Sequence, residues 1–254
     1  MSGAAVELLV IVIVVCLTVS LHALLQTHLK SDVLRRHNDV AGFLFSAVGV
    51  IYAVVLGFIV VVVWEKYDST IYNVDQEVAA VSDLYRSVGP FDNPARDQIR
   101  SELRAYVADV IKIEWPQMGE RLSPPEDVDL LENLAEHLDD YQPRNLDQSN
   151  AQEIAMAQRV RLFDARRQRL IESAPSVPLV LWFALFAGAA AMLTFAYFFG
   201  VENHPAQLVM TAVLTALIAV LFVVIDEFDH PFSGSVRISD NGWVTLQQHL
   251  AQIP

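Results

Sequence analysis

The sequence is poor in cysteine and in basic residues. Cys16 is its one cysteine, so no disulfide can form within the chain. Lysine and arginine number 17 against 30 aspartate and glutamate residues, which gives a net charge of −13. A nucleic-acid-binding protein needs a basic surface, and this composition argues against nucleic acid as a partner.

Motifs of soluble enzymes are also missing. The sequence contains no Gly-rich phosphate loop, no Gly-x-Ser-x-Gly and no His-Glu-x-x-His. These motifs serve nucleotide binding, esterase chemistry and zinc peptidase chemistry. We therefore expect that the protein is not an enzyme and that it needs no cofactor.

Charged residues are almost absent from four long apolar runs, at 4–25, 40–64, 177–200 and 207–225. Each run has about the 20 residues that a helix needs to cross a bilayer. The whole chain is 54% hydrophobic and 19% charged, whereas soluble domains have roughly 45–50% and 25%. The runs exclude a soluble enzyme, a one-span anchor and a disordered tail protein, and they make the lipid bilayer the first predicted partner.

The second run continues as an amphipathic helix. Apolar residues recur at helical spacing beyond it, at Tyr67, Ile71, Val74, Val78, Val81, Leu84 and Val88. This pattern predicts one helix that leaves the membrane and ends at Gly89-Pro90. Three further helices are predicted, from Asn93-Pro94 to Trp115-Pro116, from about 123 to 140 and from about 149 to 173.

The predicted fold class is an all-α integral membrane protein, with four transmembrane helices and a cytoplasmic helical bundle inserted between spans two and three. Its parts are a first transmembrane hairpin (1–64), a cytoplasmic helical domain (65–173), a second transmembrane hairpin (174–225) and a cytoplasmic tail (226–254). Four spans place both termini and the bundle on one side of the membrane. Basic residues near the membrane ends favour the cytoplasm for that side, by seven to three, in the plasma (inner) membrane.

Several motifs resemble those of a known family. They are residues 34–43 (LRRHNDVAGF), 52–58 (YAVVLGF), 114–116 (EWP), the Arg-rich stretch 161–170 and 229–234 (DHPFSG). With these motifs, nearly the whole chain resembles the bestrophin-like domain family, whose members are membrane proteins of prokaryotes and plants. More distantly, the chain is similar to the bestrophins, which are pentameric anion channels with four spans per subunit.

The resemblance implies a function and an assembly. It implies a passive ion channel, selective for small anions, formed by a homo-oligomer that is a pentamer by analogy, with span two lining the pore. Bestrophins carry Pro-Phe-Gly and an acidic calcium clasp after their last span. Residues 231–234 (PFSG) resemble the first part, but 235–238 (SVRI) replace the acids, so the resemblance does not extend to calcium gating.

Candidate pore residues lie on the second run. Small residues share one of its faces, namely Gly42, Ser46, Gly49, Ala53 and Gly57. Such a face either lets two helices pack closely or lines a pore around a symmetry axis. Phe45, Tyr52 and Leu56 are bulky enough to form a hydrophobic constriction, which can gate by dewetting. The pore-lining candidates are therefore Phe45, Gly49, Tyr52, Ala53 and Leu56.

The two ends of the second run carry charges. Arg35 and Arg36 precede it, where they either concentrate anions at the outer mouth or anchor the chain at the interface. Glu65 and Lys66 follow Trp64 and mark the cytoplasmic mouth, although an aromatic belt with a solvated charge pair explains the same pattern. The arginines of 159–169 contact lipid phosphates or form ion pairs with acids of the bundle.

One spacing suggests a metal site. Glu227 and His230 form a Glu-x-x-His pair with Asp229 between them, and this pair places two ligands on one helix face. Di-iron bundles need that motif twice, and the sequence has one copy; the alternative is a set of juxtamembrane acids. The competing function classes are a membrane-anchored scaffold or sensor acting through the cytoplasmic domain, and a metal-dependent membrane enzyme.

Overall fold

The computed structural model describes residues 3–28, 38–124, 129–201 and 203–252. The chain divides into two compact units. The apolar unit comprises Met1–Glu65 and Ser176–Asp229, and the polar unit comprises Lys66–Pro175 and His230–Pro254. The described residues form helices and no strands, as the hydrophobic periodicity predicts.

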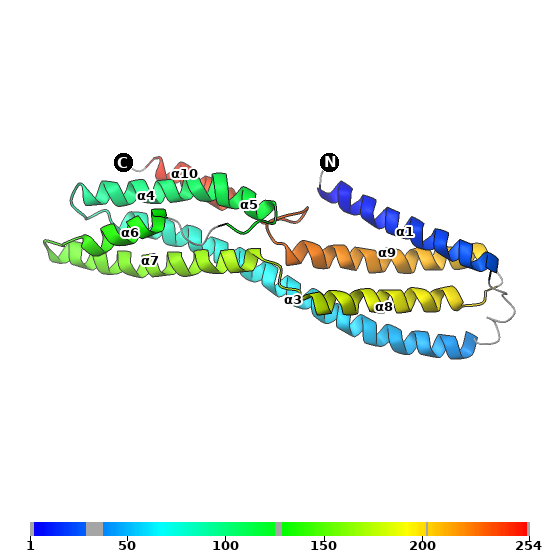
Figure 1. The fold of residues 1–254 in the computed structure, drawn as a ribbon. Coiled ribbons are helices and arrows are strands. Elements are labelled where there is room, and N and C mark those ends of the chain that lie inside the picture. Colours follow the sequence, from blue (N-terminus) through cyan, green and yellow to red (C-terminus); the bar gives the residue numbers. More distant parts are fainter. Residues whose placement is uncertain (1–2, 29–37, 125–128, 202, 253–254) are drawn as a thin grey trace. The chain divides into compact units, whose positions relative to one another are not determined.

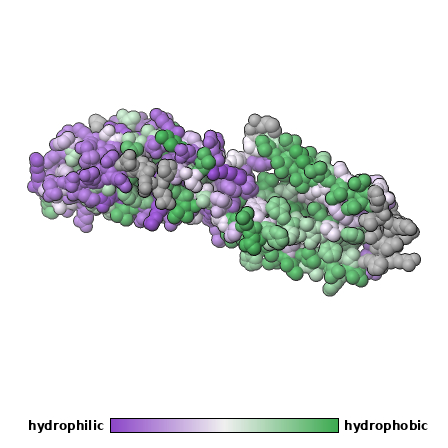
Figure 2. All heavy atoms as spheres, viewed as in Figure 1, coloured by the Kyte–Doolittle hydropathy of each residue, from purple (hydrophilic) through white to green (hydrophobic). Residues whose placement is uncertain are grey.

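The apolar unit contains α1 (Gly3–His28), the first half of α3 (Asn38–Ser87), α8 (Leu179–Phe198) and α9 (His204–Asp229) (Figure 1). All four helices are long and apolar enough to cross a membrane, as the four apolar runs predict. A helix satisfies its own backbone hydrogen bonds, and this requirement in lipid outweighs the β-branched composition of α1. Figure 2 shows hydrophobic side chains over the surface of this unit.

Helix α9 contacts both α1 and α8, and α3 packs on α8. The α3–α8 contact is made by a cluster of buried side chains that includes Tyr52, Leu56, Leu185 and Met192. Gly188 is where the two helices approach closely, because a Cβ atom there would lie 2.3 Å from Cδ2 of Tyr52. Only glycine fits under the Tyr52 ring at that position.

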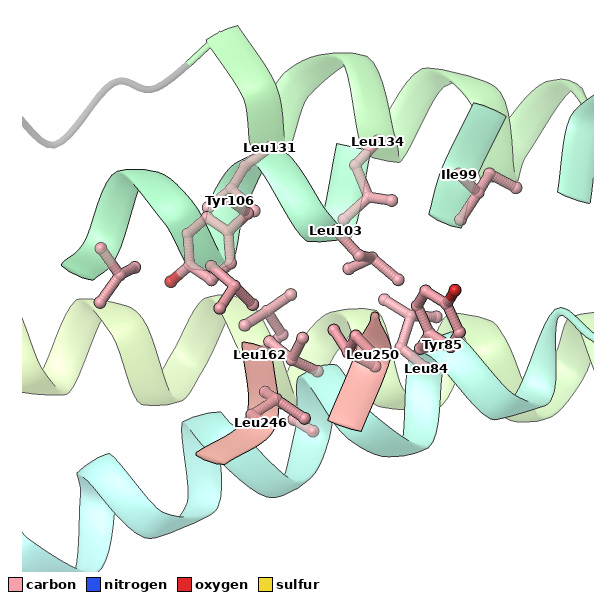
Figure 3. Close-up of a cluster of buried hydrophobic side chains, with 14 of the residues drawn as sticks. Leu84, Tyr85, Ile99, Leu103, Tyr106, Leu131, Leu134, Leu162, Leu246 and Leu250 are labelled. Atoms are coloured by element: carbon pink, nitrogen blue, oxygen red, sulfur yellow. The ribbon is translucent and has the colours of Figure 1, made fainter. Parts of the chain in front are cut away.

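The polar unit surrounds the second half of α3 with shorter helices. These are α4 (Ala95–Asp109), α5 (Trp115–Gly119), α6 (Asp129–Asp140), α7 (Leu146–Ser173) and α10 (Asn241–Leu250), with a π-helical turn η1 (Val110–Glu114) between α4 and α5. Figure 3 shows Leu84 of α3, Leu103 of α4, Leu134 of α6 and Leu162 of α7 meeting in one core. Leu246 and Leu250 of α10 complete that core, so the segment treated above as a separate tail folds into the polar unit.

Two helix boundaries test the sequence analysis. The structure confirms one unbroken helix from the second run, because α3 extends from Asn38 to Ser87 and stops before Gly89-Pro90. The predicted stop at Trp115-Pro116 is wrong, because α5 continues through these residues to Gly119. Pro116 is the second residue of α5, a helix that directly follows the π-helical turn η1, and this turn already interrupts the regular α-helical hydrogen-bond pattern.

Candidate pore helix and the ion network beside it

The first half of α3 has a face that is buried within its own chain. Tyr52 and Leu56 are 8% and 5% exposed, and both belong to the cluster against α8. The Tyr52 hydroxyl donates a hydrogen bond of 3.2 Å to the carbonyl oxygen of Leu185. This face therefore fixes the rotation of α3 relative to α8.

The other three pore candidates divide between the faces of α3. Phe45 is half-buried and meets Phe199 edge to face, with 5.7 Å between the ring centroids. Gly49 is half-buried beside Met192 of α8, and Ala53 is exposed. The structure thus separates the candidates that the sequence analysis groups together.

A second face of α3 is exposed in the single chain. Ser46, Val50, Ala53 and Gly57 follow one another at steps of four, three and four residues, and all four are exposed. Beside Gly57, a Cβ atom would meet nothing within 4 Å. We call these four residues the exposed stripe. The helix carries no charge between Val40 and Trp64, so the stripe lies on an uncharged segment.

The N-terminal end of α3 is attached to the α8–α9 turn. The Asn38 side chain donates to the carbonyl oxygen of Gly200 at 2.8 Å and accepts from the Gly200 N–H at 2.9 Å. These paired bonds tie the first residue of α3 to the turn. Arg35 and Arg36, the candidates for the outer mouth, lie outside the described residues.

At the other end of the apolar stretch, Trp64 meets Phe228 of α9 edge to face, with 5.3 Å between ring centroids. Glu65 is exposed. The Lys66 ammonium group donates to the carbonyl oxygen of Ala174, the residue that caps α7, at 2.6 Å. Because the last carbonyl groups of a helix lack partners within it, Lys66 stabilises the end of α7.

The candidate metal ligands have other partners. Asp229 is fully buried, and its Oδ1 accepts hydrogen bonds from the backbone N–H groups of Ser176 at 2.7 Å and Val177 at 3.2 Å. Within the described part of the chain, no group of three or more His, Cys, Asp or Glu side chains is arranged to hold a metal ion. The geometry therefore gives Asp229 a structural role at the entry to α8.

This role predicts a loss of stability on substitution of Asp229. In D229A, the two backbone N–H groups lose a charged acceptor, and we expect the free energy of unfolding to fall by about 2 kcal/mol. Thermal unfolding of the purified protein in detergent measures the effect. Exposed Asp68 on α3 supplies a matched control, and equal melting temperatures for D229A and D68A would contradict the assignment.

The polar unit contains a buried ion network that the sequence analysis left open. Arg169 of α7 is fully buried and donates to both carboxylate oxygens of Glu77 on α3, at 2.6 and 2.9 Å. Arg169 also donates to Glu114. Arg166 donates to the same Glu114 through two nitrogens, at 2.7 and 3.1 Å. Two arginines and two glutamates thus neutralise one another inside the unit.

The two arginines keep Glu114 ionised. Burial alone would raise the pKa of Glu114, but Arg169 and Arg166 outweigh it and hold that pKa below its usual value. Burial raises the pKa of Tyr106 far above its usual value, and the negative charge of Glu77 adds to this effect. Tyr106 therefore stays protonated and donates its hydroxyl hydrogen to Glu77.

Three arginines of the cluster form ion pairs within the polar unit, and Glu77 carries a signal that sequence reasoning missed. Arg166 and Arg169 form ion pairs within the bundle, and Arg159 pairs with Asp139 at 2.9 Å. Glu77 lies between Val74 and Val81 on the apolar stripe of the helix. An acid on such a stripe is the pattern that could have predicted a buried cationic partner.

A groove lies between α6 and α7 on the polar unit. Its volume is about 700 Å³, and Leu131, Val160 and Phe163 contribute apolar walls. Arg167 and Asp164 are among its charged lining residues.

The comparisons with known proteins agree on one fold. The sequence matches the family described as Bestrophin-like domain over residues 12–242. A crystal structure of a bacterial Bestrophin homolog from Klebsiella pneumoniae, carrying a point mutation, superposes with a TM-score of 0.70 at 15% identity. It covers 95% of this chain and 99% of that one. A second crystal structure of a point variant of a bacterial Bestrophin homolog from Klebsiella pneumoniae has a TM-score of 0.70 at 15% identity. The match covers 94% of this chain and 97% of that chain.

A crystal structure described only as a membrane protein has a TM-score of 0.69 at 14% identity, and it covers 94% of this chain and 97% of that chain. At such identities the likeness concerns the fold. No curated protein matches the sequence.

Proposed function

We propose, because the chain belongs to the Bestrophin-like domain family, that several copies of it assemble into a passive ion channel with α3 lining the pore. The channel is selective for small anions, and its oligomer is a pentamer by analogy with bestrophins. The polar unit and both termini face the cytoplasm. The observation that carries the proposal is the pair of faces on α3, one buried against α8 and one exposed.

The packing of α3 supports a pore between copies rather than within one. At the level of Gly188, α3 and α8 touch so closely that the Tyr52 ring occupies the space of a missing side chain. An aqueous path needs room for ions and water, so symmetry around an axis is the simpler source of a pore. An uncharged exposed stripe suits a passive pore, since coupled transporters place ionisable groups inside the membrane.

The faces of α3 assign different roles to the predicted pore residues. Ala53 lines the pore together with the rest of the exposed stripe, and Phe45 and Gly49 border it. Tyr52 and Leu56 orient the stripe by anchoring α3 to α8. Arg35 and Arg36 attract anions at the outer mouth, and Glu65 lies at the cytoplasmic mouth.

Cysteine modification tests which face of α3 meets water. In a C16S background, A53C is expected to react with a water-soluble, negatively charged thiosulfonate, and the reaction will reduce halide flux from proteoliposomes. Thiols react as thiolates, so a cysteine facing lipid does not react. L217C on α9 is a suitable control, because Leu217 is 61% exposed and apolar but lies on another helix.

The outcomes of this experiment separate the alternatives. Modification of A53C but not L217C, with loss of flux, supports a pore lined by the exposed stripe. Flux that is unaffected by complete modification of A53C contradicts the pore-lining role. The absence of halide flux above that of empty liposomes, for inserted oligomeric protein, contradicts the channel itself.

A second candidate function is a membrane-anchored scaffold or sensor. The groove between α6 and α7 favours it, because a hollow with apolar walls and charged lining residues is typical of a binding site. If the protein is a scaffold or sensor, substituting Phe163 at the groove will abolish partner binding and leave any halide flux unchanged. If it is a channel, modification of A53C will reduce halide flux.

A further inference from the structure

His22 of α1 lies fully buried in the apolar unit. Both of its ring nitrogens face polar side chains. Nδ1 lies 2.9 Å from Oγ1 of Thr211 on α9, and Nε2 lies 3.1 Å from Nε2 of Gln26, one helical turn further along α1. An ionisable group inside a membrane unit is expensive to bury, and such groups commonly mark functional sites.

The hydrogen bonds continue from Gln26 to the end of α8. Nε2 of Gln26 donates to Oε1 of Gln207 on α9 at 2.8 Å. Nε2 of Gln207 donates to the carbonyl oxygen of Phe199 at 2.6 Å, and Ala196 supplies a second carbonyl at 3.4 Å. Those carbonyl groups end α8 and have no partners within the helix. We call the chain from His22 through Gln26 and Gln207 to Phe199 the amide relay.

The direction of every bond in the amide relay follows from its last acceptor. A carbonyl oxygen can only accept, so Gln207 must present its NH₂ group to Phe199 and its oxygen to Gln26. Gln26 must then present its NH₂ group to Gln207, and the same group faces His22. Nε2 of His22 must therefore accept. The ring proton lies on Nδ1, which donates to Thr211, and His22 is neutral.

A second proton on His22 does not fit this relay. An N–H at Nε2 would face the NH₂ group of Gln26. Turning the Gln26 amide brings its oxygen against the oxygen of Gln207, and turning Gln207 as well brings its oxygen against the carbonyl of Phe199. Whichever amides turn, two donors or two acceptors face each other at one position of the relay. Its end point adjoins Gly200, which both bonds of Asn38 tie to the start of α3.

We propose that His22 is a proton-binding site, coupled through the amide relay to the α8–α9 turn and to the start of α3. Protonation breaks the hydrogen bonds of the relay, weakens the two hydrogen bonds between Gly200 and Asn38, and lowers conduction. The effect on conduction rests on the proposed function, whereas the state of His22 does not.

Two other titratable groups act on His22 among the described residues. His204 of α9 interacts with it electrostatically. Tyr197 of α8 packs on the His22 ring with centroids 4.7 Å apart and donates its hydroxyl hydrogen to the carbonyl of Thr18 at 3.2 Å. A test must therefore separate His22 from His204.

Solid-state NMR of the lipid-embedded protein, labelled uniformly with ¹³C and ¹⁵N, tests the proton site directly. His22, assigned through Leu21 and Ala23, is expected to be neutral with the proton on Nδ1 at about pH 7.5, well above the ordinary histidine pKa of about 6.5. On acidification, protonation of His22 is expected to shift the signals of Phe199 and Gly200. A proton on Nε2 at neutral pH, or an unchanged turn after protonation, overturns the proposal.

Halide flux from proteoliposomes at about pH 7.5 and about pH 5 tests the effect on conduction. Flux through the wild type is expected to fall at least about threefold on acidification, because only the neutral state of His22 fits the conducting relay. H22Q, which cannot titrate, is expected to lose this fall. H204Q and H137Q should keep it, and His137 belongs to the polar unit.

The NMR and flux experiments distinguish failure of the His22 proposal from failure of the proposed channel function. A pH response that survives in H22Q overturns the coupling to conduction, and one that disappears in H204Q assigns the proton to His204 instead. Absence of flux at both pH values overturns the proposed function. In that case the NMR result still decides whether His22 is the proton site.

Discussion

The R169M variant is expected to lose about 3–5 kcal/mol of stability, a large part of the stability of an ordinary domain. Arg169 is the one residue that pairs with both Glu77 and Glu114 in the described network. Removing its charge leaves the carboxylate of Glu77 buried without a cation. An unpaired buried charge costs much more than the pair contributes.

Denaturant unfolding, followed by the fluorescence of Trp115 and Trp243, measures this loss. R167M is the matched control, because Arg167 is two residues earlier on α7 and is exposed, and surface ion pairs contribute only about 0–1 kcal/mol. The double variant R169M/E77L should recover part of the loss, because it removes the stranded charge as well. Equal stabilities for R169M and R167M would contradict the role of Arg169.

The network also predicts the acid stability of the polar unit. The pKa of Glu114 is lowered by its arginine partners despite burial, so ionised Glu114 stabilises the folded state above its unfolded pKa of about 4.3. That contribution is lost as the pH falls through the lowered folded value. Denaturant unfolding at neutral and acidic pH should therefore show that the wild type loses more of its neutral-pH stability on acidification than E114Q, which has no carboxyl group to protonate at this position.

Replacing Gly188 by alanine is the second change that is expected to cause a large loss of stability. The new methyl group would lie 2.3 Å from one ring carbon of Tyr52 and 2.5 Å from another. No rotation of a methyl group relieves such contacts, so α3 and α8 must separate or the Tyr52 ring must leave the cluster. Overpacking of this kind costs about 1–3 kcal/mol, and more where backbones must move.

G57A is the matched control for G188A. Both changes replace a glycine within an apolar helix, but a Cβ at Gly57 meets nothing within 4 Å. Thermal unfolding in detergent and size-exclusion chromatography should show a less stable and poorly assembled G188A protein beside an intact G57A protein. The double variant G188A/Y52L should recover stability, since leucine leaves room for the methyl group. A stable G188A protein would show that the two helices pack less closely than described.

The sequence predicts the length of α3 well and its rotation poorly. Apolar residues at helical spacing after Trp64, followed by Gly89-Pro90, are enough to predict one unbroken helix, and α3 confirms it. The first half of α3 is apolar around its whole circumference, so hydrophobic periodicity cannot tell which face meets α8. The missing information was the pairing of Tyr52 with Gly188, a contact between residues far apart in the chain.

The ion network and the amide relay were hidden for a related reason. Glu77 and Glu114 lie in helices that otherwise look amphipathic, and the arginines near 166 suit a membrane boundary equally well. His22 and Gln207 lie near the ends of apolar runs, where polar residues are common. Each interaction depends on two or three helices meeting, which the pattern along a single helix does not specify.

The position of α10 constrains how the protein is made. Its residues follow both hairpins in the chain, yet Gly242 lies beside Val78 of α3 and the His249 ring lies 3.3 Å from the guanidinium group of Arg86. During translation, the part of α3 that α10 covers, beside Val78, therefore stays uncovered until almost the whole chain has been synthesised. Contacts between such distant segments form slowly, and exposed apolar surface invites aggregation. Shortening the chain before Trp243 is thus expected to leave a nascent protein that chaperones and proteases recognise, even though every membrane span is already in place.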